Sequence, residues 1–365
     1  MSGMDVGSLG RALAVIGLGW GMSGAVFAQA PTVPVYKEIK DWLIACDNTR
    51  FCEAKGFSDA ESAAMRITRS AGAEDDLAVE IDAPDTNVEP DVAIFSLDGR
   101  RLDLKTIRWA PLDGMGSGQI TLASGDPDSA YRLLRRIRDG KVLSLGSSKT
   151  AAAVPLHGLA AVLLLMDDVQ GRIGNVSALM QPGHAPASTT PPAPPVPVLK
   201  SAPNPPALSV PEGRALAAAV RLGQRASLQR NDCTPGAGGN KDQTEPLNAS
   251  SVLVMLECTR GAYQSSYLLF RASRTEVGTA NLLTLPQPPG AQSVDDDRFE
   301  GVVEPVYDTR KATLSVSSKS RGLADCGMHA EWRFDGVNFA PSMYQQQNKC
   351  GGGLPGDWPT LWQAR

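Results

Sequence analysis

Six cysteines are the residues of this chain with the clearest chemistry, because thiols form disulfides, bind metals or act as nucleophiles. They follow one another as three neighbouring pairs: Cys46 and Cys52, Cys233 and Cys258, and Cys326 and Cys350. Six cysteines can pair in many ways, and the sequence alone does not choose among them. We predict bridges between sequential neighbours, one in the first half of the chain and two in the second.

An apolar run near the N-terminus indicates the compartment in which these cysteines fold. Residues 12–27 are rich in Leu, Val, Ile and Ala, and the run ends at Ala28. It is shorter than the roughly 20 residues that span a bilayer. The pattern predicts a secretory signal peptide over residues 1–28, and the alternatives are cleavage after Ala30 or an uncleaved membrane anchor. We therefore expect a periplasmic or secreted protein with no stable membrane span after leader removal, in a compartment where disulfides persist.

Metal and redox chemistry are the alternatives for the cysteines. Cys326 and His329 are spaced C-x-x-H, which suits zinc, but no second pair of matching spacing accompanies them. The sequence also lacks the C-x-x-C spacing of disulfide oxidoreductases. We therefore predict structural disulfides and expect neither a metal nor a cofactor.

Residues that could carry out catalysis are few. The chain has three histidines, and His329 lies near Asp325 and several serines. None of the familiar motifs that position a nucleophile, a phosphate or a catalytic zinc ion occurs in the sequence. We therefore favour a protein without enzymatic activity, and an envelope hydrolase that uses His329 and Asp325 is the alternative.

Aromatic and charged residues near the C-terminus form a candidate binding set. Exposed tryptophans could stack on sugar rings, but aromatic residues this dense usually build a core, which is the interpretation we favour here. Arginine and aspartate four residues apart either fix a tight cross-linked turn, which we favour, or face a ligand. The candidate binding residues are Arg321, Asp325, His329, Trp332, Trp358 and Trp362.

The charge of the chain restricts its partners. The formal net charge is -4, and a mildly acidic exported protein is not expected to bind nucleic acid. One basic run occurs at helical spacing, beside apolar residues of the same predicted helix: Arg132, Arg135, Arg136 and Arg138. We interpret this run as the solvated face of an amphipathic helix, and the alternative is a site for an anionic surface.

A proline-rich stretch divides the chain into two parts. Residues 181–210 hold runs such as Pro-Pro-Ala-Pro-Pro, which cannot bury enough apolar surface to offset the entropy of the chain. We predict an exposed, disordered linker here, extended because proline favours that conformation. It separates an N-terminal α+β domain over residues 33–180 from a β-rich C-terminal domain over residues 211–365, which is expected to hold two disulfides.

Both domains are expected to belong to the α+β class, with mostly antiparallel strands and one or two helices each. Alternating or apolar runs predict strands at residues 42–46, 92–97, 120–122, 252–258, 266–271, 302–306, 312–317, 330–334 and 337–341. Asp98-Gly99 and Asp335-Gly336 are turn signals between strands. Apolar periodicity and flanking glycines predict helices over residues 127–139, 155–170 and 211–222.

Several short motifs carry a resemblance to a known family. The motifs lie in residues 41–52, 168–174, 321–327, 332–336, 350–352 and 357–362. Through these motifs the chain is similar to the DUF1176 family, secreted bacterial proteins that contain a domain of unknown function. Two positions depart from the family pattern: Ala324 replaces a glycine, and Gly351 replaces an expected arginine, whose charged contact this chain would lack. The first domain also distantly resembles the invasion-associated locus B family through its strand-Cys opening and residues 156–161.

Neither resemblance implies a reaction, a cofactor or a catalytic residue. The expected function is that of an uncharacterised periplasmic or secreted protein, a non-enzymatic module that binds or supports a component of the bacterial envelope. The expected partner is accordingly a cell-envelope component or another protein. An inhibitor or host-interaction factor is a further alternative, which the distant resemblance alone suggests.

Overall fold

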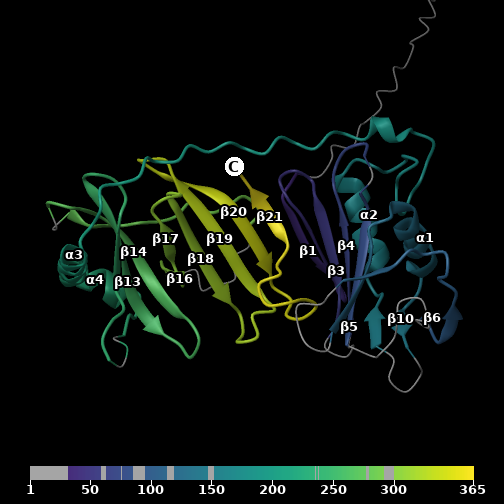
Figure 1. Cartoon of the computed structure of the whole chain (residues 1–365), viewed down its shortest axis with the longest axis horizontal. Coiled ribbons are helices and arrows are strands. Elements are labelled where there is room, and N and C mark those ends of the chain that lie inside the picture. The colour runs from purple at the N-terminus through teal and green to yellow at the C-terminus, as the bar shows by residue number, and fades with distance from the viewer. Residues whose placement is uncertain are drawn as a thin grey trace, which may run out of the picture.

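The protein has an α+β fold dominated by antiparallel strands, as predicted (Figure 1). The computed structural model describes residues 32–58, 63–74, 76–84, 95–112, 119–146, 152–234, 236, 238–276, 279–291 and 300–365. The predicted leader, residues 1–28, lies outside this part of the chain. The described residues form four sheets, two from the N-terminal half and two from the C-terminal half, which we call the N-terminal and C-terminal lobes.

The N-terminal lobe is built on a seven-stranded antiparallel sheet. Its strands, in spatial order, are β1 (Val35–Ile39), β2 (Trp42–Cys46), β3 (Cys52–Gly56), β4 (Ala64–Arg69), β5 (Ala78–Pro84), β9 (Gln119–Ser124) and β8 (Ala110–Leu112). A four-stranded sheet beside it has the order β11 (Ala152–Pro155), β10 (Val142–Leu145), β6 (Phe95–Leu97) and β7 (Arg100–Leu102). Two helices, α1 (Pro127–Ile137) and α2 (Leu159–Val169), complete the lobe.

Strand β2 is buried on both of its faces, whereas its sequence predicts one buried face. Trp42 and Ile44 pack with the helices in the core of the N-terminal lobe. Ala45, on the opposite face, joins the core of the C-terminal lobe. The strand itself is confirmed, and its second face is covered because the C-terminal lobe packs against it.

Helix α2 begins later than the sequence predicts. Pro155 is the last residue of β11, an edge strand, where a missing backbone N–H is tolerated. The helix starts after Gly158, which has a φ of 105° and caps its N-terminus. A Cβ at Gly158 would lie 2.2 Å from the carbonyl oxygen of Ile39. The close approach of two backbone segments, rather than the proline, therefore sets where α2 begins.

The C-terminal lobe is a pair of packed sheets. The first contains β12 (Gln243–Pro246), β13 (Ser251–Arg260), β14 (Ser265–Ser273), β15 (Asn281–Leu282) and β16 (Val302–Val303). The second has the order β17 (Val306–Asp308), β18 (Thr313–Lys319), β19 (Gly327–Phe334), β20 (Phe339–Gln347) and β21 (Thr360–Gln363). Helices α3 (Val210–Gly223) and α4 (Arg225–Arg230) cover the outer face of the first sheet.

The turns and most strands of the sequence analysis are confirmed, with one exception. Asp98-Gly99 joins β6 to β7, and Asp335-Gly336 joins β19 to β20. The predicted strand over residues 302–306 is wrong, because the chain changes sheets within it. Glu304 has a φ of 46°, and it separates β16, which pairs with β14, from β17, which pairs with β18. Of the strand predicted at residues 92–97, only residues 95–97 are described, as β6.

The proline-rich stretch runs as an extended strap beside both lobes (Figure 1). It contains one short 3-10 helix, η2 (Ala187–Thr189). Farther on, Leu199 N–H donates to the carbonyl of Arg365 at 2.6 Å, and Ala202 N–H donates to the carbonyl of Phe334 at 2.8 Å. The division into two domains and the disorder of the linker stay predictions.

All three predicted disulfides are present. Cα–Cα distances are 4.0 Å for Cys46–Cys52, 4.3 Å for Cys233–Cys258 and 4.6 Å for Cys326–Cys350. Disulfides of this kind are typical of proteins that fold outside the cytoplasm. Within the described part of the chain, none of the helices combines the length and the apolar character needed to cross a membrane.

A substitution at the start of α2 tests the close approach described above. Gly158→Ala should lower the free energy of unfolding by about 2–5 kcal/mol, because the new Cβ clashes with the Ile39 carbonyl and the backbone is strained. Chemical denaturation measures the change. Gly223→Ala is the matched control, since an added Cβ there meets nothing within 4 Å. Equal stability of the two variants would contradict the geometry.

Candidate functional site

Arg321 and Asp325 are partners of each other in the loop between β18 and β19. Arg321 Nε donates to Asp325 Oδ1 at 2.8 Å, and a second guanidinium nitrogen donates to the other carboxylate oxygen. This hydrogen bonding lowers the pKa of Asp325. Ser320 N–H donates to the carbonyl of Cys326 at 3.1 Å and closes the loop. The two residues therefore shape a tight turn, the structural role that the sequence analysis favoured.

The backbone is in the positive-φ region at both positions that depart from the family pattern. Ala324 has a φ of 56°, in the left-handed region where glycine is the preferred residue. Gly351 has a φ of 117°, and a Cβ there would lie 3.0 Å from the ring of Phe57. An arginine at position 351 would therefore need a different backbone here.

The loop that holds Arg321 is fastened to the loop between β20 and β21. The Cys326–Cys350 disulfide joins them covalently. Gln347 Nε2 donates to the carbonyls of Asp325 at 3.0 Å and of Gly351 at 2.7 Å. Gly356 N–H donates to the carbonyl of Ala324 at 2.9 Å. The two loops thus form one cross-linked block.

This block exposes large apolar side chains. Leu323 is 66% exposed and Leu354 is 38% exposed. Tyr263, in the β13–β14 turn, is 49% exposed and lies next to Gly322. We call Tyr263, Leu323 and Leu354 the apolar loop end. The sequence does not predict this surface, because apolar residues between glycines indicate a turn but do not reveal which side chains face solvent.

His329 lies apart from Asp325 and has other partners. Ser317 Oγ is 2.8 Å from His329 Nδ1, and Glu331 Oε1 is 3.4 Å from His329 Nε2. Ser317 is the direct cross-strand neighbour of His329, and Glu331 follows it by two residues on β19, so all three lie on one face of the sheet. The hydrogen bond from His329 lowers the pKa of Glu331. The predicted pair of His329 and Asp325 is therefore not brought together.

The three candidate tryptophans belong to the packed interior or its border. Trp332 is buried, and its Nε1 donates to the carbonyl of Pro286 at 2.7 Å. Trp358 is buried, and its ring lies 3.0 Å from the position that a Cβ at Gly327 would occupy. Trp362 is half-buried, and its Nε1 donates to a backbone carbonyl at 3.1 Å. Buried rings cannot present a face to a sugar, so core packing is the role that these positions support.

Cys326 has no thiolate with which to bind a metal, because its sulfur is part of a disulfide. Ligand atoms of Asp325, Cys326 and Cys350 lie within 4.8 Å of one another, but the two sulfurs are bonded in the disulfide. A disulfide sulfur is not a thiolate, which is the form of cysteine that binds zinc. His329, the second residue of the C-x-x-H motif, is engaged with Ser317.

The described residues line a cavity of about 310 Å³ at another place in the C-terminal lobe. Residues before and at the start of α3 form one wall, and β12 forms the other. Thr244 and Glu245 of β12 are among its lining residues, and burial raises the pKa of Glu245. None of the candidate binding residues contributes to this cavity.

A buried lysine joins the two lobes. Lys55, on β3, has a side chain that is only 1% exposed. Its Nζ lies 3.2 Å from Asp357 Oδ2, 3.4 Å from Glu53 Oε1 and 3.4 Å from Gln347 Oε1, and it also donates to the backbone carbonyl of Asp357. Burial raises the pKa of Glu53, and the positive charge of Lys55 opposes that shift. The role of Lys55 is not predicted from the sequence, since a single lysine in a strand gives no signal of burial.

Arg66 extends this cluster along the face of the seven-stranded sheet. Its Nε donates to Glu80 at 2.9 Å, and an NH1 nitrogen lies 3.2 Å from Asp357 Oδ1. Burial alone would lower the pKa of Arg66, but Asp357 and the hydrogen bond to Glu80 outweigh it and raise the pKa. We call Glu53, Lys55, Arg66, Glu80 and Asp357 the lobe-junction cluster.

Hydrogen bonds between side chains and backbone groups also connect the two lobes. Asn48 Nδ2 donates to the carbonyl of Gln363 at 3.0 Å, and Gln363 N–H donates back to Asn48 Oδ1 at 2.8 Å. Asn348 N–H donates to the hydroxyl of Tyr36 at 2.9 Å. Lys349 Nζ donates to the carbonyl of Phe57 at 2.8 Å. Asn48, in the motif over residues 41–52, thus meets Gln363, which directly follows the motif over residues 357–362.

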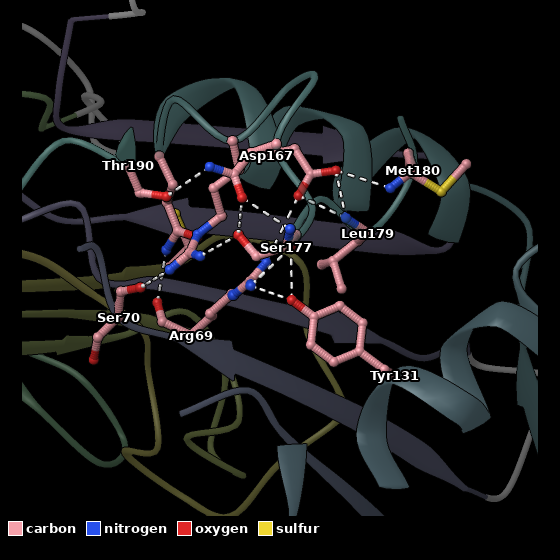
Figure 2. Close-up of polar contacts among 12 residues, drawn as sticks. Arg69, Ser70, Tyr131, Asp167, Ser177, Leu179, Met180 and Thr190 are labelled. Atoms are coloured by element: carbon pink, nitrogen blue, oxygen red, sulfur yellow. Dashed lines mark hydrogen bonds and ion pairs between the residues drawn. The ribbon is translucent and has the colours of Figure 1, made fainter. Parts of the chain in front are cut away.

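The motif over residues 168–174 lies in a second buried polar network, inside the N-terminal lobe (Figure 2). Arg172 is fully buried; it donates to Gln170 Oε1 at 3.2 Å, to Ser177 Oγ at 2.8 Å and to the carbonyl of Gly72 at 2.7 Å. Figure 2 also shows Asp167 pointing at the backbone N–H groups of Leu179 and Met180, which donate to it at 2.8 Å. Burial raises the pKa of Asp167, and those hydrogen bonds oppose the shift.

This network ties the start of the strap to the sheet. Arg69 is fully buried; it donates to the carbonyl of Ser177 at 2.9 Å and contacts the hydroxyl of Tyr131 on α1. Asn175 Nδ2 donates to the carbonyl of Pro186 at 2.7 Å. The guanidinium groups of Arg69 and Arg172 donate to buried backbone carbonyls, so this motif has a structural role rather than a ligand-binding one.

The fold and the lobe-junction cluster define a class of protein with two antiparallel-β lobes. Buried ion pairs join the lobes, and each lobe contains at least one disulfide. The chain belongs to the family described as "Protein of unknown function (DUF1176)", whose model matches residues 36–365. It is similar to an uncharacterized protein, YpfG, of Escherichia coli (strain K12), with 29% identity over 353 residues, 93% of this chain and 97% of that protein. No solved structure matches the chain. These comparisons do not show the resemblance to the invasion-associated locus B family, which stays a prediction.

Removing the buried lysine tests the lobe junction. Lys55→Met should lower the free energy of unfolding by about 3–5 kcal/mol, because Glu53 and Asp357 lose their cation in a place with little water. Urea denaturation measures the loss, and hydrogen exchange of the β21 amides should accelerate.

Lys37→Met is the matched control, because Lys37 is exposed on β1 of the same sheet. It should change the free energy of unfolding by no more than about 0.5 kcal/mol. If Lys55→Met were as stable as this control, the ion cluster would not be what holds the lobes together.

Removing the buried arginine tests the second network. Arg172→Leu should cost about 3–5 kcal/mol of unfolding free energy, because the Gly72 carbonyl and Ser177 hydroxyl lose their donor inside the protein. The measurement is chemical denaturation beside Arg225→Leu, which removes an exposed arginine on α4. A loss below about 1 kcal/mol would show that water replaces the guanidinium, and the network would then not be structural.

Proposed function

We propose that this protein is a non-enzymatic binding module of the bacterial envelope, periplasmic or secreted, which holds a protein partner against its apolar loop end. The single observation that carries the proposal is the exposure of Leu323, Leu354 and Tyr263 on neighbouring loops. Single exposed apolar residues are ordinary on protein surfaces, whereas a group of them on adjoining loops is typical of an interaction site.

The rigidity of these loops supports the proposal. The Cys326–Cys350 disulfide, the hydrogen bonds of Gln347 and the Arg321–Asp325 pair hold the loop block in one shape. A surface that is ordered before binding loses little entropy when a partner docks. Leucine and tyrosine side chains on such a surface suit an apolar patch on another protein.

One observation favours a second candidate, an envelope hydrolase. Ser317, His329 and Glu331 form a hydrogen-bonded row of nucleophile, base and carboxylate. In this row Glu331, and not Asp325, takes the place of the carboxylate that orients the histidine. The row lies on the strand pair β18–β19, and none of its three residues lines the cavity at α3 and β12. We therefore place binding ahead of hydrolysis.

Site-specific photocrosslinking tests the proposed binding surface. A photoreactive residue at Leu323 should capture one envelope protein in living cells, and the same residue at Val337 should not. Val337 is a suitable control because it is 63% exposed, close to the 66% of Leu323, but lies in the β19–β20 turn. The captured protein is then purified and its dissociation constant is measured directly.

Leu323→Asp should weaken the binding of that purified partner at least about tenfold, since a carboxylate would be buried against an apolar surface. Val337→Asp should leave the binding unchanged. Equal effects of the two substitutions would remove the apolar loop end from the proposal. A serine-reactive fluorophosphonate that labels the wild-type protein and not Ser317→Ala would instead establish the hydrolase. A partner from a host cell would identify the inhibitor or host-interaction class.

A further inference from the structure

The far end of the N-terminal lobe gathers positive charge that no feature discussed above explains. Residues 95–112 and 119–141 contain nine Lys or Arg and five Asp or Glu, a net charge of +4. The whole chain has a net charge of -4, so the remaining residues together carry -8. Positive charge is therefore concentrated in these two segments, and the rest of the chain carries an excess of negative charge.

The structure brings cations from separate segments to one surface. Two exposed arginines of α1 reach across to the loop that follows β7: Arg132 donates to the carbonyl of Thr106 at 3.2 Å, and Arg136 contacts the carbonyl of Asp103. Lys105 and Arg108 are exposed in that same loop, and Arg100 and Arg101 are exposed on β7, the strand directly before it. We call the resulting set the basic face; it comprises Arg100, Arg101, Lys105, Arg108, Arg132 and Arg136.

The carboxylates nearby are mostly directed at the backbone. Asp98 accepts the N–H groups of Lys141 and Val142, both at 2.9 Å. Asp103 accepts the N–H of Lys105 at 3.1 Å, and Asp126 caps the N-terminus of α1. Asp126 also forms an ion pair with Arg132 at 3.8 Å. The carboxylates thus mainly complete turns and a helix cap, and the cations outnumber them, so this end of the lobe attracts an external anion.

We propose that the basic face docks on a membrane surface of anionic phospholipid headgroups. Five of its six cations are arginines, whose planar guanidinium groups match phosphate oxygens in pairs. Every cation is exposed and none lines the cavity at α3, so the face suits a broad array of phosphates rather than one small anion. Basic clusters near anionic lipid are attracted strongly at ordinary ionic strength.

The position of this face agrees with such a role. Helix α1 and strands β6 and β10 lie at the end of the molecule away from the C-terminal lobe (Figure 1). Docking through this end leaves the C-terminal lobe directed away from the lipid. From the sequence alone, the α1 arginines are interpreted as the solvated face of a helix. The exposed cations of β7 and of the loop after it add to these arginines, so we now favour a surface that binds anions.

Vesicle co-sedimentation tests the proposal with the full chain. Phosphatidylcholine vesicles that contain about 30% phosphatidylglycerol should bind the protein at least tenfold more strongly than pure phosphatidylcholine. The difference should disappear as salt rises from about 0.05 to 0.5 M, because the attraction is screened. The apolar N-terminal run is the same in both measurements, so its own affinity for lipid does not contribute to the difference.

The decisive variant reverses three cations of the basic face that make no side-chain hydrogen bond among the described residues: Arg101→Glu, Lys105→Glu and Arg108→Glu. Its preference for phosphatidylglycerol should fall at least tenfold. The matched control reverses three exposed cations of the C-terminal lobe, Arg225→Glu, Lys241→Glu and Arg310→Glu, which changes the net charge equally. Circular dichroism and thermal unfolding confirm that both variants fold.

Three results would overturn the proposal. The wild-type protein could show no preference for phosphatidylglycerol. Both variants could lose binding equally, which would mean that net charge alone matters. The protein could bind soluble heparin and ignore the vesicles, which would assign the face to an acidic polymer. None of these results bears on the partner captured at Leu323, so the two proposals fail separately.

Discussion

The burial of Lys55 is the constraint on which the arrangement of the two lobes depends. Taking an ammonium group out of water costs several kcal/mol unless anions and hydrogen-bond acceptors replace the water. Asp357 supplies a carboxylate and a carbonyl, and Gln347 supplies a further oxygen. These groups come from the opposite lobe, so Lys55 is satisfied only when the lobes are docked and the β20–β21 loop is in place. The Cys326–Cys350 bridge restrains that loop.

The same constraint explains where the motifs of the family occur. Residues 41–52 and 357–362 lie at opposite ends of the chain, yet β2 and β21 come together at the junction, where Asn48 is hydrogen-bonded to Gln363, the residue directly after the second motif. A match that covers residues 36–365 is expected when the contacts that complete one lobe come from the other. The charged residues within these motifs satisfy buried groups. Their charge alone is therefore no sign of a ligand.

The sequence predicted features whose determinants are local. The α1 periodicity, the Asp98-Gly99 turn and the disulfide pairs needed only near neighbours in the chain. Features set by distant contacts could not be predicted. The start of α2 depends on the Ile39 carbonyl, and the burial of Lys55 depends on Asp357. The sequence favours core packing for Trp332 and Trp358, but only the fold shows that both rings are buried, because a tryptophan gives the same signal in a sequence whether it faces a ligand or a core.

Burial separates the two kinds of charge in this molecule. Arg69 and Arg172 are fully buried, and their guanidinium groups are engaged by carbonyls and hydroxyls. The arginines of β7 and α1 are exposed, and they belong to the part of the chain that carries an excess of positive charge. Arg132 and Arg136 donate to carbonyls of the loop after β7, whereas the side chains of Arg101, Lys105 and Arg108 make no hydrogen bond among the described residues and can face an external anion. The lobe-junction cluster holds the two lobes in one arrangement. A partner at the apolar loop end and an anionic surface at the basic face would therefore stay at a fixed distance from each other.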